Sequence, residues 1–103
     1  MSEAAGRYRS FSAFYPFYLQ EHVNPTSRRL HVVGTGLVIL ALIVGIALDW
    51  RLLVLAPLLG YGFAWVGHFF FEKNRPATFR YPLYSLMGDF RLFFETVTGR
   101  RRW

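Results

Sequence analysis

Two uncharged apolar runs separated by only three residues constrain this chain more than any other feature. The first, "VVGTGLVILALIVGIAL", covers residues 32–48 and begins at residue 30 if the preceding leucine and histidine are included, and the second covers residues 52–71. Each approaches the roughly 20 residues that an α-helix needs to cross the hydrocarbon of a bilayer. The intervening "DWR" leaves room only for a reversal of the chain. The sequence therefore predicts two antiparallel transmembrane helices over about residues 30–48 and 52–71.

The size of the chain supports this interpretation. A soluble domain of 103 residues leaves about two-fifths of its unfolded surface in contact with water, so it cannot hide a composition that is 53% hydrophobic and 19% aromatic. We therefore predict an all-α membrane protein with a single domain over residues 1–103. Its expected architecture is a two-span antiparallel transmembrane hairpin with flanking amphipathic or interfacial helices.

The basic residues orient the hairpin. The net charge is +6, and eleven of the twelve lysines and arginines lie outside the short turn, which holds only Arg51. By the positive-inside rule, both termini are expected in the cytoplasm. No recognisable nucleic-acid motif accompanies these residues, so we expect no nucleic-acid partner. The eleven residues are Arg7, Arg9, Arg28, Arg29, Lys73, Arg75, Arg80, Arg91, Arg100, Arg101 and Arg102.

The segments on either side of the spans predict interfacial helices. In "FSAFYPFYLQEH" an aromatic stripe ends at His22, and Pro16 is expected to kink or restart the helix. Asn24 and Pro25 are typical of a helix start, here leading into the first span. A second stripe precedes Gly99, and we expect both stripes to anchor the chain among lipid headgroups instead of lining a substrate pocket. The stripes comprise Phe11, Phe14, Tyr18 and His22, and then Leu83, Leu86, Phe90, Phe93, Phe94 and Val97.

All three histidines of the chain are expected at one face of the membrane. His31 begins the first span and His68 lies near the end of the second, so an antiparallel hairpin brings them to the same level, and His22 precedes the first span by a short turn. Small residues share a helical face with each span histidine, which allows close approach of the two helices. These faces are His31, Gly34, Val38, Ala41 and Gly45 on the first span, and Gly60, Ala64, His68 and Glu72 on the second.

Such a rim suits a metal ion with nitrogen and oxygen ligands. The chain has no cysteine, so imidazoles would combine with Glu72, Glu21 or Asp89 as candidate carboxylates, a set that fits iron, zinc or manganese. Two histidines with one carboxylate, or three histidines with the acid behind them, would both leave positions open for a substrate. Two simpler interpretations stay open, namely that the histidines only form local hydrogen bonds and that Asp89 is a surface carboxylate.

Three blocks of the sequence carry a family resemblance. These are "FYPFYLQEHVNPTSRRLHVVGT" at residues 14–35, "GHFFFEKNRPATF" at residues 67–79, and the following "YPLYSLMGDFRLFFE". They resemble the Mpo1-like family of small bacterial and fungal membrane proteins. The resemblance implies an Fe(II)-dependent dioxygenase that shortens 2-hydroxy fatty acids by one carbon in alpha-oxidation. It implies metal binding by His22, His31 and His68, with support from Glu72, Asn24 and Asn74. We expect this chain in the bacterial inner membrane.

Arginines near the same rim fit an acidic lipid. Arg28, Arg29 or Arg75 would neutralise the carboxylate of a fatty-acid substrate whose chain stays in the membrane. Two other functions remain open from the sequence: a non-catalytic lipid-binding or membrane assembly module, and a zinc-dependent lipid hydrolase. The small-residue faces suit association between chains as well, so a homo-oligomer also stays open.

Overall fold

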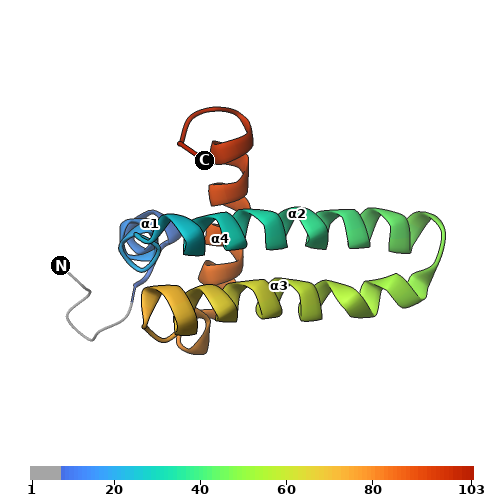
Figure 1. Cartoon of the computed structure of the whole chain (residues 1–103), viewed down its shortest axis with the longest axis horizontal. Coiled ribbons are helices and arrows are strands. Elements are labelled where there is room, and N and C mark those ends of the chain that lie inside the picture. The colour runs from blue at the N-terminus through green and yellow to red at the C-terminus, as the bar shows by residue number, and fades with distance from the viewer. Residues whose placement is uncertain (1–7) are drawn as a thin grey trace.

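The computed structural model describes residues 8–103, and within this range every regular element is helical. Residues 1–7, which include Arg7 of the basic flank, lie outside the described residues. Four α-helices are joined by three shorter helical turns (Figure 1). The helices are α1 (Phe11–Gln20), α2 (Pro25–Ala47), α3 (Leu55–Val66) and α4 (Pro82–Val97), and the turns are 3-10 helical at Trp50–Val54, π-helical at Gly67–Glu72 and 3-10 helical at Ala77–Phe79.

The predicted hairpin is confirmed. Helix α2 runs antiparallel to α3 and its two flanking turns, and each arm has 23 residues, long and apolar enough to cross a membrane (Figure 1). Glycines let the arms approach closely, because a Cβ at Gly34 would lie 2.7 Å from the Cβ of Phe63 and one at Gly45 would lie 2.7 Å from a methyl of Leu53. The predicted start of α2 is also confirmed, with Asn24 as the N-cap and Pro25 at the first helical position.

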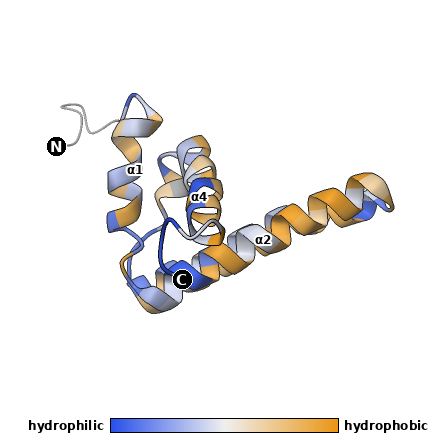
Figure 2. Cartoon of the chain, turned by 90° about the horizontal axis from the view of Figure 1, so that it is seen from above, coloured by the Kyte–Doolittle hydropathy of each residue, from blue (hydrophilic) through white to orange (hydrophobic). Residues whose placement is uncertain are grey.

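The half of the hairpin nearest the reversal is bare apolar surface, shown in orange on α2 in Figure 2. The side chains of Ile46, Leu48 and Leu58 are 78%, 83% and 66% exposed. Contiguous apolar surface of this kind is uncommon on soluble monomers and is typical of a surface in contact with lipid. The exposure therefore supports the membrane interpretation of the two arms.

The other half of the hairpin is covered by α1 and α4, which lie side by side on one face of it (Figure 2). Helix α4 crosses both arms near the end where α2 begins (Figure 1). The core between them is aromatic, with Phe14 and Tyr18 of α1 and Leu92 of α4 at most 1% exposed. Gly88 of α4 fits directly against the Tyr18 ring, since a Cβ there would lie 2.7 Å from it.

One expectation for these flanking helices is wrong, and one of the two alternatives for Pro16 is excluded. The stripe of α1 does not anchor the chain in lipid headgroups, because Phe14 and Tyr18 pack into this core and Tyr18 also lines a cavity. Pro16 does not restart the helix, since α1 is one continuous segment. Pro16 has no backbone N–H to donate to the carbonyl of Ser12, four residues earlier. Ser12 is an exposed residue in the first turn of α1, so water can bind this carbonyl instead. On α4, by contrast, Leu83, Leu86, Phe94 and Val97 are exposed, as expected for contact with lipid.

Candidate metal centre

Three separate elements each contribute one histidine to a single buried cluster. His22 follows α1, His31 lies in the second turn of α2, and His68 lies in the π-helical turn after α3. Their side chains are 2%, 3% and 3% exposed, and one ring nitrogen from each lies within 4.8 Å of the other two. The structure thus brings together the three histidines that the antiparallel hairpin predicts at one level. Their role as metal ligands stays a prediction at this point.

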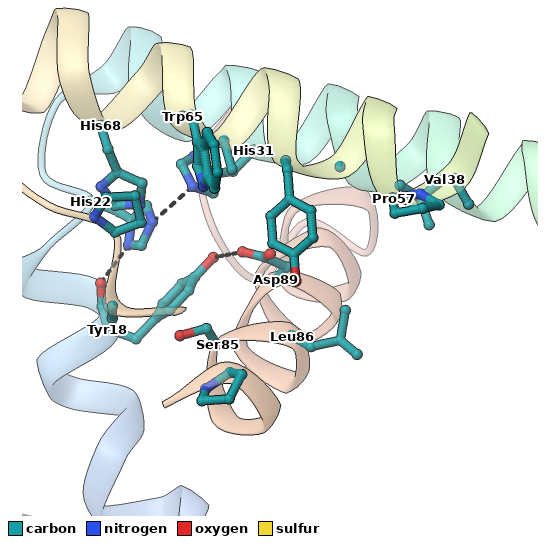
Figure 3. Close-up of a pocket in the computed structure, with 17 residues that line it drawn as sticks. Tyr18, His22, His31, Val38, Pro57, Trp65, His68, Ser85, Leu86 and Asp89 are labelled. Carbon is teal, nitrogen blue, oxygen red and sulfur yellow. Dashed lines mark hydrogen bonds between the residues drawn. The ribbon is translucent and has the colours of Figure 1, made fainter. Parts of the chain in front are cut away.

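The outer nitrogen of each ring is occupied by a hydrogen bond to an oxygen. The Nδ1 of His22 donates to the carbonyl of Tyr18 at 2.6 Å (Figure 3), and that of His31 donates to the carbonyl of Ser27 at 2.9 Å. The Nδ1 of His68 donates to the side-chain oxygen of Asn74 at 2.7 Å. Because these oxygens only accept, they assign the proton of each neutral ring to Nδ1 and leave Nε2 with a free lone pair.

The free nitrogens face one another, which is the arrangement that a cation requires. The Nε2 atoms of His22 and His31 are 3.0 Å apart. Two lone pairs at this distance repel unless a positive charge lies between them, and nitrogens bound to one ion at about 2.0–2.1 Å lie roughly 3 Å apart. Burial above all, with His31, His68 and Arg28 nearby, holds the pKa of His22 well below its ordinary value, so its ring stays neutral. The three residues therefore fit a metal ion.

The end of the second arm is shaped to hold His68. Lys73 adopts a left-handed conformation with φ 63°, and the N–H of Asn74 then returns to the carbonyl of His68 at 3.1 Å. This reversal sets the amide of Asn74 against the His68 ring, while its NH₂ group donates to the backbone carbonyl of Glu21 at 3.2 Å. Asn74 therefore links the second arm, through Glu21, to the end of α1. A π-helical turn at this point is consistent with a functional site.

Glu72 and Asn24 bind each other and not the histidines. The backbone N–H of Asn24 donates to the Glu72 carboxylate at 2.9 Å, and the Asn24 side chain caps α2 by accepting from the N–H groups of Thr26 and Ser27. This contact ties the end of the second arm to the start of the first. Among the described residues, the group of side chains close enough to share an ion holds the three histidines and no carboxylate.

The comparisons with known proteins agree with the resemblance seen in the sequence. A family model described as "2-hydroxy-palmitic acid dioxygenase Mpo1-like" matches residues 8–101. The chain belongs to the Mpo1-like family. The match covers all three histidines and every helix of the structure. No curated protein and no solved structure matches this Mpo1-like chain.

Asp89 of this Mpo1-like protein is not a surface carboxylate. It accepts a hydrogen bond of 2.6 Å from the Tyr18 hydroxyl and faces the same cavity as the histidines (Figure 3). Burial raises the pKa of Asp89 to about 7, an effect that the Tyr18 hydroxyl partly offsets. The Tyr18 ring in turn stacks on His22 with ring centres 4.0 Å apart. Asp89 is thus connected to the histidine cluster through Tyr18.

Sequence reasoning missed two groups that orient the histidines, the carbonyls of Tyr18 and Ser27. Each precedes its histidine by four residues, and this spacing is the only sequence signal that could have indicated them. Gly67 was missed as well. A Cβ at Gly67 would lie 2.8 Å from the Ser27 hydroxyl and 3.3 Å from the His31 ring, so the absence of a side chain lets the arms close around the cluster.

The three candidate arginines lie outside the cavity that the histidines line. Arg29 lies over the Trp103 ring at 5.7 Å and Arg75 over the Phe79 ring at 5.5 Å. Arg28 influences the histidine cluster directly, since its positive charge contributes to the lowered pKa of His22. A role for any of them in substrate binding stays a prediction.

Proposed function

We propose that this Mpo1-like chain is an Fe(II)-dependent dioxygenase that shortens 2-hydroxy fatty acids by one carbon at the membrane surface. The observation that carries the proposal is the convergence of one ring nitrogen from each of three histidines whose rings are each fixed by a hydrogen bond at Nδ1. Hydrogen bonds of this kind orient the imidazole ligands of metal sites and raise their basicity. The family description supplies the substrate class, since it names 2-hydroxy-palmitic acid.

In this proposal His22, His31 and His68 would hold the iron, which would supply the redox chemistry that activates oxygen. The protein's own contribution is to fix the three rings and to exclude water, which the burial of all three side chains favours. The overall reaction is a 2-hydroxy acid plus O₂ giving the acid one carbon shorter, CO₂ and water. It balances in atoms and electrons without a further reductant. We assign neutralisation of the substrate carboxylate to Arg28, with Arg29 and Arg75 as the other candidates.

We further propose that the chain resides in the bacterial inner membrane, with both termini in the cytoplasm. The two apolar arms and the exposed apolar surface near their reversal support membrane insertion. The excess of basic residues away from that reversal supports the orientation. The histidines then face the cytoplasmic rim, where the head group of a fatty acid lies.

Oxygen uptake tests the proposal directly. Protein prepared without oxygen and loaded with Fe(II) is expected to consume O₂ when 2-hydroxypalmitate is added and to release the acid one carbon shorter. Palmitate, which lacks the 2-hydroxyl group, and protein carrying His68→Ala are the controls and should give no uptake. Metal binding with ester cleavage but no oxygen uptake would indicate the zinc hydrolase instead. Absence of both metal binding and turnover would indicate a non-catalytic lipid-binding or assembly module.

A further inference from the structure

A cavity of about 270 Å³ extends from the histidines along the hairpin, between its second arm and α4 (Figure 3). Its polar end holds the three histidines, Tyr18, Ser85 and Asp89, and the remainder is mostly apolar. The apolar lining comes from both arms and from α4. It includes Val38, Ala56, Pro57, Gly60, Tyr61, Ala64, Trp65 and Leu86.

One face of the second arm lines the cavity. Its lining residues recur every three or four positions from Pro57 of α3 to His68 of the following π-helical turn, a span of roughly 16 Å at 1.5 Å per residue. Gly60 and Ala64 have little or no side chain, so this face of the arm leaves room for the cavity. The small face predicted to pack on the first span therefore lines the cavity in part, while Phe63 makes the close contact with Gly34 of α2.

A polar group at the polar end of the cavity, the hydroxyl of Ser85, lacks a hydrogen-bond partner among the described residues. The Ser85 side chain lies beside Tyr18 at the polar end of the cavity (Figure 3), the residue is only 7% exposed, and its hydroxyl has no hydrogen-bond partner among the described residues. A buried hydroxyl without a partner is costly, so this position calls for a polar group inside the cavity. The unpaired hydroxyl, the free Nε2 atoms and the apolar groove together describe a ligand with a polar head and one apolar tail.

We infer that the cavity binds one unbranched acyl chain, with the polar head between the histidines and Ser85 and the tail between α3 and α4. A volume of about 270 Å³ is near the lower limit of roughly 300 Å³ for small-molecule pockets, so a second chain does not fit. The tail gains little affinity here because bilayer hydrocarbon is equally apolar. The groove contributes position, since it fixes the carbon next to the head at the histidines. The inference rests on the proposed function for the identity of the head group only.

Photo-crosslinking in native membranes tests the position of the tail. A 2-hydroxy fatty acid with a diazirine midway along its chain should label Val38, which lines the cavity, at least tenfold more than Leu58, which is exposed on α3. Ala64→Phe fills the groove about 6 Å from His68 and should remove the label at Val38. Gly62→Phe adds the same bulk where nothing lies within 4 Å and is the matched control. Equal labelling of Val38 and Leu58, or Val38 labelling that survives Ala64→Phe, would overturn the inference.

A second variant tests the head, and metal content shows that each variant is folded. Ser85→Ala removes the unpaired hydroxyl and should lower the label at Val38 by roughly two- to tenfold, while an unchanged label would exclude this position for the head. Ala64→Leu replaces Ala64→Phe if the latter loses its metal. Labelled Val38 without oxygen uptake would leave the inference standing and remove the proposed dioxygenase. Oxygen uptake with the label confined to Leu58 would support the proposed dioxygenase and overturn the inference about the acyl chain.

Discussion

The contact between α4 and the Tyr18 ring predicts that Gly88→Ala damages both the fold and the metal centre. The added Cβ would lie 2.7 Å, 2.8 Å and 3.1 Å from three atoms of that ring, well inside van der Waals contact. The ring cannot retreat, because Tyr18 is 1% exposed, stacks on His22 and donates to Asp89 at 2.6 Å. Any relief of the clash must therefore move His22 or lengthen the bond to Asp89.

The magnitude follows from two opposing effects. Overpacking a rigid core costs about 1–3 kcal/mol, while replacing a helical glycine with alanine returns about 0.8–1.0 kcal/mol. Gly62→Ala is the matched control, since nothing lies within 4 Å of its added Cβ and only the helical gain remains. Gly88→Ala should therefore be about 1–3 kcal/mol less stable than Gly62→Ala. Because the clash disturbs a ring behind a ligand, its metal affinity should also fall about 10- to 100-fold.

Two measurements on protein in detergent micelles check this expectation. Unfolding by titration with a denaturing detergent gives the difference in free energy between the two variants. Anaerobic competition with a chelator gives the affinity for Fe(II). A Gly88→Ala protein as stable as Gly62→Ala, with the metal affinity of the wild type, would refute the argument that α4 holds Tyr18 and His22 in place.

Three further predictions concern the partners of the cluster and the topology. Asn74→Ala removes the acceptor of the His68 Nδ1 proton and should weaken metal binding about 10- to 100-fold in the same chelator assay. Asn74→Asp keeps an acceptor oxygen and should retain most of the metal affinity. Equal metal affinities for the two variants would be contrary to the proposed role of Asn74. Because burial raises the pKa of Asp89 from 3.8 to about 7, the folded protein keeps a proton that the unfolded chain releases. The stability that Asp89 contributes should thus fall as the pH rises from about 4 to about 7, whereas buried His22 changes stability with pH in the opposite direction. The difference in free energy of unfolding between the wild type and Asp89→Asn isolates the Asp89 effect and should shift in favour of Asp89→Asn as the pH rises; a difference that does not change with pH would exclude it. Since the chain has no cysteine, a membrane-impermeant maleimide should label Arg51→Cys but not Arg102→Cys in intact cells, and the opposite pattern would invert the topology.

The hairpin could be predicted from the sequence because it depends on length and hydropathy alone. Two runs near the span length and a three-residue reversal leave one arrangement, and that arrangement places His31 and His68 at the same level. His22 could be predicted at the same level as His31 and His68, because only two residues separate it from the capped start of α2. These inferences need no knowledge of side-chain packing.

Other parts of the structure depend on contacts that the sequence pattern does not encode. The aromatic stripe of α1 has the same spacing whether it faces headgroups or another helix, so its burial against α4 could not be foreseen. The bond between Tyr18 and Asp89 joins residues 71 positions apart. The carbonyls that fix His22 and His31 belong to the backbone, and no residue type identifies them. The cavity along Ala64 could not be foreseen, because small residues permit either a close helix contact or an open groove.

The central claim is that His22, His31 and His68 hold one metal ion, and X-ray absorption spectroscopy on anaerobically prepared protein tests it most directly. We expect one Fe(II) per chain with three imidazole nitrogens among its ligands, and loss of that ion on replacing any one of the three histidines with alanine. Protein that binds no iron when supplied with Fe(II), or that keeps a full complement after His31→Ala, would contradict it.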